Sequence, residues 1–490
     1  MTALSTESLV VIAVLTPFVG ALIIPLFHRI PNLRETVTLA TAVSLCLIAF
    51  SLLGPVFDGG RPEAQVIRVA PGLDIAFKVE PLGMLFALVA ASLWIVNSIY
   101  SIGYMRANNE PRQTTFYVCF AVALGSTIGV AFAKNLFTLF LFYEALTLST
   151  YPLVTHKRNE EAVRAGRIYL LLLLGTSLLL FLPAIIATWA FAGTLDFTPG
   201  GILAGKAGAP VIAVLLALYV FGIGKAAVMP VHFWLPAAMV APTPVSALLH
   251  AVAVVKAGVF TVVKVAVFVF GVDNLSSLGQ SAWLTAAAGT TVIAASIVAL
   301  RQDNLKRRLA YSTISQLSYV VLGVAILAPI SLTGAAMHIA AHAFSKITLF
   351  FAAGSIYTAA HLTEVSQLDG IGRRMPWTMA AFTIGALGMI GIPPTAGFLG
   401  KWFILTGAMQ TANWLAVSVI VASTLLNAGY FLPIVFRAFF REAAGDGHRP
   451  KSGEAPWPIV LALIATAAGS MLMFFLPGIP YTLATLMMGR

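Results

Sequence analysis

Charged side chains that can exchange protons lie inside long apolar stretches of this sequence. They are five lysines and one glutamate: Lys225, Lys256, Lys264, Lys346, Lys401 and Glu144. Each such charge costs about 2.5–3.5 kcal/mol on membrane-insertion scales, so packing alone does not explain the group. Arginine stays protonated in proteins, whereas a lysine removed from water can accept and release a proton near neutral pH. The residue types predict a proton relay, except at Lys264, near a helix end, where a fixed charge reaching the interface is favoured.

Histidines accompany two of these lysines. His338, His342 and Lys346 follow one another at a spacing of four, which places them on one face of a helix. His250 lies within two helical turns of Lys256. A single histidine in an apolar helix is more often a packing residue, but alignment with a lysine favours a supporting role in proton transfer.

The composition indicates what surrounds these groups. The chain has 490 residues, of which 59% are hydrophobic and 10% charged, against roughly 45–50% and about 25% in soluble domains. Its mean hydropathy is +0.93. Only lipid can solvate so much apolar surface, which excludes a soluble globular enzyme. We expect a single transmembrane domain over residues 1–490.

The apolar stretches predict an all-α polytopic membrane protein with about fourteen transmembrane helices. Their expected ranges are 8–27, 37–57, 81–103, 114–133, 135–154, 168–190, 210–236, 243–270, 282–300, 311–328, 331–359, 377–409, 413–436 and 457–476. Between the second and third of them, residues 58–80 contain Gly59-Gly60 and Pro71-Gly72. That segment predicts a short hairpin outside the bilayer.

Basic residues between the spans predict the orientation of the chain. Loops after odd-numbered spans hold eighteen Lys and Arg residues, whereas loops after even-numbered spans and the C-terminus hold six. Because Lys and Arg collect in cytoplasmic loops, both termini are expected on the non-cytoplasmic side. We interpret the basic clusters at 156–158 and 306–308 as topology anchors rather than nucleic-acid sites, although the formal net charge is +11.

Two of the predicted spans, the seventh and the twelfth, are interrupted by proline. The seventh contains Pro230 and the twelfth contains Pro393 and Pro394, and each carries one lysine of the expected relay. Breaks at membrane depth persist where the freed backbone groups line a cavity. The breaks are about 165 residues apart, an offset that maps spans 4–8 onto spans 9–13. Because five is an odd number of crossings, the second unit enters the membrane from the opposite side to the first. Inverted repeats are therefore expected at 114–270 and 282–436, with chance placement of prolines as the alternative.

Four segments closely resemble the antiporter-like subunits of respiratory complex I, Mrp-type sodium/proton antiporters and membrane-bound hydrogenases. They are HFWLPAAMVAPTPVSALLHAVAVVKAGVF at 232–260, NLKRRLAYSTISQLSYVVLG at 304–323, HIAAHAFSKITLFFAAGSI at 338–356 and GIPPTAGFLGKW at 391–402. The resemblance spans about residues 80–440 and implies fourteen core helices, ten of which form two inverted five-helix repeats. The chain resembles the shorter members, especially the D-type component of Mrp antiporters. Lys401 argues against the complex I branch that has glutamate in helix 12.

The resemblance also implies roles for individual residues. Glu144 is similar to the helix-5 glutamate that pairs with the helix-7 lysine, here Lys225. Lys256 resembles the central lysine of helix 8, and His250 occupies a position where some members use histidine. The connecting group of helix 11 corresponds to Lys346 with His338 and His342. The terminal lysine of helix 12 corresponds to Lys401.

The expected function is that of a proton-translocating subunit in a multisubunit monovalent cation (Na+)/H+ antiporter. The alternative is a proton-pumping subunit of a redox-driven complex of the NADH:quinone oxidoreductase or membrane-bound hydrogenase type. A structural scaffold would leave the aligned titratable residues unexplained. The expected partners are other membrane subunits, protons and, in an antiporter, Na+, in the inner membrane of a prokaryote.

Cofactor chemistry is not expected in this chain. Cys46 and Cys119 lie in apolar runs and are interpreted as packing residues. The sequence contains no CxxC cluster, Rossmann glycine pattern or haem motif. We therefore expect no cofactor or metal, and any redox centre would belong to another subunit. Whether the assembly is an enzyme stays open at this stage.

Overall fold

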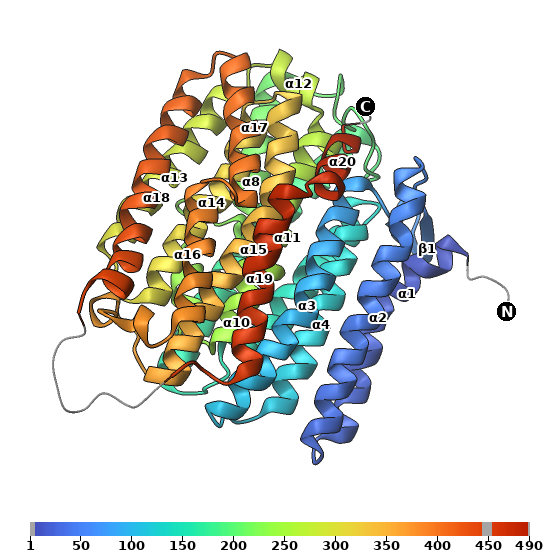
Figure 1. The fold of residues 1–490 in the computed structure, drawn as a ribbon. Helices are drawn as coiled ribbons and strands as arrows, with labels where there is room; N and C mark the ends of the chain where they lie inside the picture. The colour runs from blue at the N-terminus through green and yellow to red at the C-terminus, as the bar shows by residue number, and fades with distance from the viewer. Residues whose placement is uncertain (1–4, 443–452, 489–490) are drawn as a thin grey trace.

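The computed structural model describes residues 5–442 and 453–488, which form a bundle of long helices (Figure 1). The first spans are α1 (Thr6–Ile23) with the short turn η1 (Ile24–Phe27), α2 (Pro31–Phe57), α3 (Pro81–Ala107), α4 (Gln113–Phe132) and α5 (Leu136–Val154). The next span combines α6 (Glu160–Thr176), the π-helical turn η2 (Ser177–Phe181) and α7 (Leu182–Ala192). The prediction of an all-α polytopic membrane protein is confirmed.

The middle of the chain contains the first interrupted span. It consists of α8 (Ala209–Gly222), the 3₁₀ turn η3 (Gly224–Ala226), α9 (Trp234–Ala237) and η4 (Ala238–Val240). The following span is α10 (Thr243–Ala247), η5 (Leu248–Val252), α11 (Val254–Lys264) and η6 (Val265–Phe270). The break starts at residue 223, seven residues before Pro230. The proline therefore prevents the helix from resuming rather than marking where it stops.

The last part of the chain contains the second interrupted span. The helices of this part of the chain are α12 (Val272–Ser277), α13 (Ser281–Arg301), α14 (Leu305–Ala325), α15 (Pro329–Ala360), α16 (Pro376–Ile390), α17 (Ala396–Gln410), α18 (Trp414–Phe440), α19 (Trp457–Phe475) and α20 (Gly478–Leu486). The interrupted span consists of α16 and α17. The short turns η7 (Val365–Gln367) and η8 (Ile371–Arg373) precede α16. The gap between α16 and α17 contains Pro393 and Pro394, as predicted.

Eleven of the described helices are long and apolar enough to cross a membrane by length and composition. Three further predicted spans fall short of that measure for a physical reason. α8 and α16 end early at the two breaks, and α14 is polar because Ser, Thr and Gln side chains cover its buried faces. Interrupted or polar helices are stable at membrane depth only when other helices cover them.

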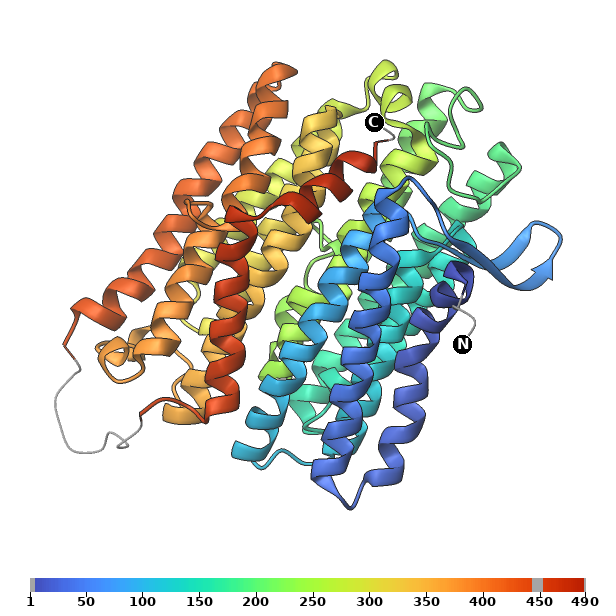
Figure 2. The ribbon, with the colours of Figure 1, turned by 45° about the vertical axis from the view of Figure 1, so that its right-hand side comes forward.

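A β-hairpin lies between α2 and α3, as predicted. β1 (Glu63–Ala70) pairs antiparallel with β2 (Leu73–Lys78), and Ala70 lies opposite Leu73. The turn between them contains Gly72 with φ +78°, which glycine adopts without a steric penalty. Figure 2 shows the hairpin extending from one end of the bundle.

The loops divide between the two ends of the bundle according to the parity of the preceding span. One pocket is lined by residues that follow even-numbered spans, among them Arg61, Pro199, Asp273 and Leu327. A second pocket is lined by residues that follow odd-numbered spans, including Lys157, Asn304 and Thr363. The alternation agrees with the predicted order of crossings, and α20 ends at the same pocket as the hairpin.

The basic cluster at 306–308 is bound to the protein rather than fully solvated. The Lys306 ammonium donates to the carbonyl of Ala241 at 2.6 Å. The Arg308 guanidinium donates to the carbonyls of Gln302 and Tyr430 at 2.8 and 3.1 Å. α14 begins at Leu305, before the predicted start of its span at 311, where the side chain of the N-cap residue Asn304 accepts from the backbone N–H of Arg307. Three other basic loop residues, Arg449, Lys451 and Arg490, lie outside the described residues.

Candidate functional site

α15 and the span from Thr243 to Phe270 form the centre of the site because both are buried along nearly their whole length. α15 packs against α14, α16, α17 and α19, and also contacts α10, η5 and α11. The apolar surface of the outer helices, such as Leu22 and Leu425, is exposed as expected for lipid-facing positions. The charged groups of the site are therefore held away from lipid.

Lys225 lies in the break of the seventh span and is fully buried. Its ammonium donates to the Thr147 hydroxyl at 2.6 Å and to the Tyr143 carbonyl at 2.9 Å. The same nitrogen lies 3.2 Å from the centroid of the Tyr143 ring, which adds a cation–π contact. The break in the seventh span thus places this lysine against α5.

Glu144 follows Tyr143 on α5 but does not contact Lys225. Both of its carboxyl oxygens are buried and have no hydrogen-bond partner. The expected ion pair is therefore not formed in this conformation, because the lysine bonds to the backbone and hydroxyl of α5 instead. A buried carboxylate without partners is costly and is stable only where the surroundings or a second conformation compensate.

Lys256 and His342 form the central contact of the site. The Lys256 ammonium nitrogen lies 2.5 Å from Nδ1 of His342, which links α11 to α15. Both side chains are buried, and Nε2 of His342 has no hydrogen-bond partner. The two groups can share one proton, since either the amine or the imidazole can hold it.

His250 contacts α14 rather than Lys256. Its Nδ1 lies 3.2 Å from the Thr313 hydroxyl, and its ring lies 4.8 Å from the Phe350 ring. Nε2 of His250 is buried and unpartnered. The π-helical turn η5 changes the register between His250 and Lys256, so their spacing in sequence does not place them on one helix face.

The aligned residues of α15 contact α14. His338 Nε2 lies 3.1 Å from Oε1 of Gln316, and the His338 and His342 ring centroids are 6.1 Å apart. The Lys346 ammonium donates to the Ser312 hydroxyl at 2.9 Å. α15 is continuous from Pro329 to Ala360, so the three residues lie on one face of one helix, as predicted. His338 and Lys346 contact α14 from it, whereas His342 contacts Lys256 on α11.

Lys401 binds the end of α16 across the second break. Its ammonium donates to the carbonyls of Met389 and Ile390 at 2.6 and 3.1 Å. Carbonyls in the last turn of a helix have no partner within the helix, and a cation there also interacts favourably with the helix dipole. Nε2 of Gln316 donates to the same Met389 carbonyl at 3.2 Å. Gln316 therefore connects His338 to the acceptor of Lys401.

The chain matches the family model described as "NADH:quinone oxidoreductase/Mrp antiporter, TM" over residues 133–427. That range is more than half of the chain and contains every predicted site residue. The chain belongs to this family. It is an antiporter-like membrane subunit, as the four sequence segments predicted.

Individual relatives and solved structures agree with this assignment. The antiporter-like subunit is 31% identical to "NADH-quinone oxidoreductase subunit N" of Desulforudis audaxviator, over 92% of this chain and 90% of that protein. It is 30% identical to a probable K(+)/H(+) antiporter component of Rhizobium meliloti, over 92% of this chain but 45% of that protein. In fold it resembles a chain of the Mrp complex from Dietzia sp. DQ12-45-1b, with a TM-score of 0.86, 22% identity and coverage of 100% and 97%.

Several residues of the site were not predicted from the sequence. Gln316, Ser312 and Thr147 bind the predicted histidine and lysines directly. The signal for the first two is the polar segment YSTISQLSY at 311–319, which lies inside a predicted membrane span. Tyr430 donates to Ser312 at 3.2 Å and so extends the Lys346 contact to α18. A polar run within an apolar span is itself evidence of an internal polar path.

The described part of the antiporter-like subunit holds no cluster of three or more His, Cys, Asp or Glu side chains suited to a metal ion. Its polar centre instead consists of amines, imidazoles, hydroxyls and carbonyls. Buried nitrogens without partners occur on His250, His338 and His342. An imidazole nitrogen can either donate or accept a hydrogen bond, depending on the tautomer.

Gln316 provides a test of the connection between His338 and Lys401. We expect Gln316→Leu to lower the proton-transport rate of the assembled complex by about threefold to tenfold. Leucine is similar in size to glutamine but lacks the amide that joins His338 to the Met389 carbonyl. Ser318→Ala is the matched control, since the buried Ser318 hydroxyl on the same helix has no partner. A Gln316→Leu complex that transports at the wild-type rate would show that this link carries no protons.

Proposed function

We propose that this antiporter-like subunit translocates protons within a multisubunit monovalent cation (Na+)/H+ antiporter. The main relay groups are Glu144, Lys225, Lys256, Lys346 and Lys401, and the supporting groups are His250, His338 and His342. The observation that carries the proposal is the 2.5 Å contact between Lys256 and His342 in the buried centre of the bundle. Its partners in the assembly would be other membrane subunits, as in the Mrp complex that it resembles in fold.

The relay continues from Lys256 to the second break along named contacts. His342 and His338 are neighbours on α15, and Gln316 joins His338 to the carbonyl of Met389, which also binds Lys401. Lys346 joins the same region through Ser312 on α14. These contacts outline a lateral path for protons from α11 to α17. Its one step without a direct hydrogen bond is between His342 and His338, whose ring centroids are 6.1 Å apart.

Glu144 and Lys225 are proposed to control the other end of the relay. A carboxylate close to Lys225 would stabilise the ammonium, and its withdrawal would favour release of the proton. The present contacts of Lys225 with Tyr143 and Thr147 represent the separated arrangement in this scheme. A pair of unit charges 4 Å apart at an effective dielectric of 20 interacts by about 4 kcal/mol, which is enough to control a proton.

The proposal includes the predicted topology. Two inverted repeats, 114–270 and 282–436, within a single domain over 1–490 would bring one broken span from each repeat to the relay. The protein would lie in the inner membrane of a prokaryote with both termini on the non-cytoplasmic side. The segregation of basic loop residues supports this orientation.

A redox-driven complex is the second candidate. The observation in its favour is the relative named NADH-quinone oxidoreductase subunit N, which this chain matches over 90% of that protein's length. The assembly would then belong to an enzyme, and the electron carriers would reside in other subunits. Both candidates use the same relay groups.

The source of energy separates the two candidates. We expect inverted vesicles containing the complex to show sodium-dependent proton movement without an oxidisable donor, measured with a pH-sensitive dye. The matched control is the same preparation with the complex omitted. Proton movement that requires oxidation of NADH or another donor, and does not respond to Na+, would favour the redox-driven complex instead.

A further inference from the structure

A buried ion pair lies outside the relay described above. The Lys264 ammonium lies 3.2 Å from Oε2 of Glu80, and both side chains are almost completely buried. Lys264 also donates to the Ala133 carbonyl at the end of α4, at 2.8 Å, and lies 4.4 Å from the centroid of the Phe197 ring. The fixed interfacial charge expected at Lys264 is instead one half of a buried pair, whose other half lies before α3 in the chain.

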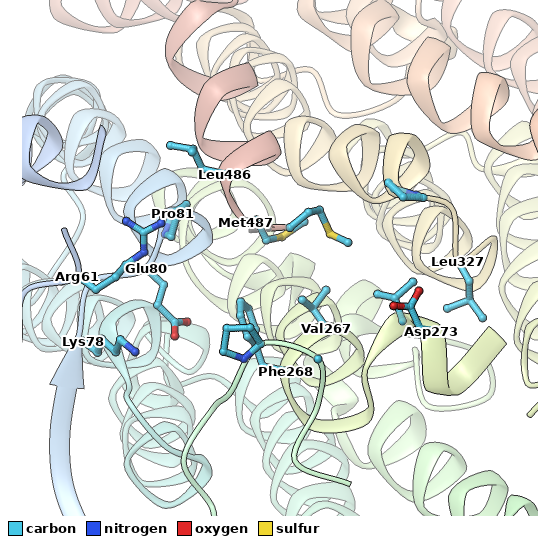
Figure 3. A pocket seen from close by; sticks show the side chains of 15 residues that line it. Arg61, Lys78, Glu80, Pro81, Val267, Phe268, Asp273, Leu327, Leu486 and Met487 are labelled. Atoms are coloured by element: carbon cyan, nitrogen blue, oxygen red, sulfur yellow. The ribbon is translucent and has the colours of Figure 1, made fainter. Parts of the chain in front are cut away.

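Glu80 lies between this lysine and an opening on the hairpin side. It lines a pocket of about 250 Å³, here called the hairpin-side pocket, together with Arg61, Lys78, Phe268 and Asp273. Figure 3 shows the Glu80 side chain near those of Arg61 and Lys78, whereas Phe268 and Asp273 come from the end of the Thr243–Phe270 span and from α12. Lys264 does not line the pocket, so the Glu80 carboxylate is the group that meets both the pocket and the buried ammonium.

The Thr243–Phe270 span runs between the hairpin-side pocket and the pocket lined by Lys157, Asn304 and Thr363. Thr243 at its start lines the pocket formed by loops after odd-numbered spans, and Phe268 near its end lines the hairpin-side pocket. His250, Lys256 and Lys264 follow one another along this span between the two ends. Lys256 and Lys264 are eight residues apart, which is about 12 Å along a helix.

We propose that Glu80 and Lys264 form a proton-exchange site between the hairpin-side pocket and Lys256. The proposal rests on the proposed function, because it supplies that relay with access to the hairpin side. In the transfer, an N–H bond of the Lys264 ammonium breaks and an O–H bond forms on the Glu80 carboxylate. Solvent in the pocket then takes the proton from Glu80, which restores the carboxylate, and the neutral Lys264 amine accepts the next proton from the direction of Lys256.

The test must separate exchange from simple anchoring of α3 to α11. The neutral pair Glu80→Gln with Lys264→Met removes both charges and leaves neither one unpaired. We expect the assembled complex with this pair to transport protons about tenfold more slowly. The matched control is Glu63→Gln with Lys134→Met, which neutralises a partly exposed ion pair, 3.4 Å apart, between β1 and the segment that joins α4 to α5, and is expected to keep the wild-type rate.

A neutral-pair complex that assembles normally and transports at the wild-type rate would overturn the proposal. Blocking the pocket gives a second test that leaves the ion pair intact. In a background with Cys46→Ser and Cys119→Ser, a bulky thiol reagent on Met487→Cys, in the pocket wall, is expected to slow transport about tenfold. The same label on Val66→Cys of the exposed hairpin is expected to have no effect, and normal transport with Met487→Cys labelled would also overturn the proposal.

Lys256→Met distinguishes failure of this proposal from failure of the proposed function. If Lys256→Met abolishes transport but the neutral pair and the blocked pocket do not, the relay stands and only the hairpin-side site is wrong. If Lys256→Met transports normally, the proposed function itself fails, whatever the result at Glu80 and Lys264.

Discussion

A complex in which Lys256 is replaced by methionine is expected to assemble normally and to lose proton transport by about a hundredfold or more. Methionine fills nearly the same volume as lysine, and removal of a buried charge relieves its desolvation penalty, so folding should not suffer. Transport should fail because Lys256 provides the 2.5 Å connection between α11 and His342 on α15. Methionine cannot hold or pass on a proton at that position.

The measurement is the initial rate of proton uptake by vesicles containing the purified complex, followed with a pH-sensitive dye. Lys206→Met serves as the control, since Lys206 is an exposed lysine that donates to the Ala192 carbonyl at the surface. Retention of more than about half of the wild-type rate by Lys256→Met would exclude Lys256 as an obligatory relay group. Equal amounts of partner subunits must co-purify with both variants for the comparison to hold.

Hydropathy predicted the membrane spans because the bilayer imposes a fixed apolar length on any helix that crosses it. It was least accurate where polar contacts replace apolar surface. α14 starts at Leu305 rather than 311, since Asn304 caps it there and the charged Lys306 and Arg308 of its first turns bind backbone carbonyls of other segments. Similarly, the seventh span is broken from residue 223, although its proline lies at 230.

The candidate site was predictable to the level of residue type and helix face. The spacing of His338, His342 and Lys346 predicted a common face because the helical repeat alone determines it. The partners were not predictable, since Lys401 binds carbonyls freed by the second break and Lys225 binds the Tyr143 carbonyl on a different helix, α5. Pairing between distant segments, such as Glu80 with Lys264, depends on how helices are arranged and leaves no local signal in the sequence.

The asymmetry between the two breaks follows from the same contacts. Lys401 bonds two carbonyls at the end of α16, so its charge interacts with the negative end of a helix dipole. Lys225 instead bonds the middle of α5, where the dipole contributes little, and the nearby charge is Glu144. The proposed control by a carboxylate therefore applies to the first break, whereas the partner of Lys401 at the second break is a helix end.

Replacement of Glu144 by glutamine is accordingly expected to slow transport by about tenfold to a hundredfold while the complex still assembles. Glutamine has the same shape but no charge, and Glu144 now makes no hydrogen bond that folding would lose. The loss should come from Lys225, which could no longer be stabilised as an ammonium by an approaching carboxylate. Glu160→Gln, at an exposed position in the first turn of α6, is the matched control.

The double variant Glu144→Gln with Lys225→Met tests whether the two residues act as a unit. If Glu144 works only through Lys225, the double variant should transport no more slowly than Lys225→Met alone, because effects within one functional unit are not additive. Independent roles would instead multiply the two losses. Transport by Glu144→Gln at the full wild-type rate would contradict the proposed control of Lys225, since the separated arrangement would then suffice for every turnover.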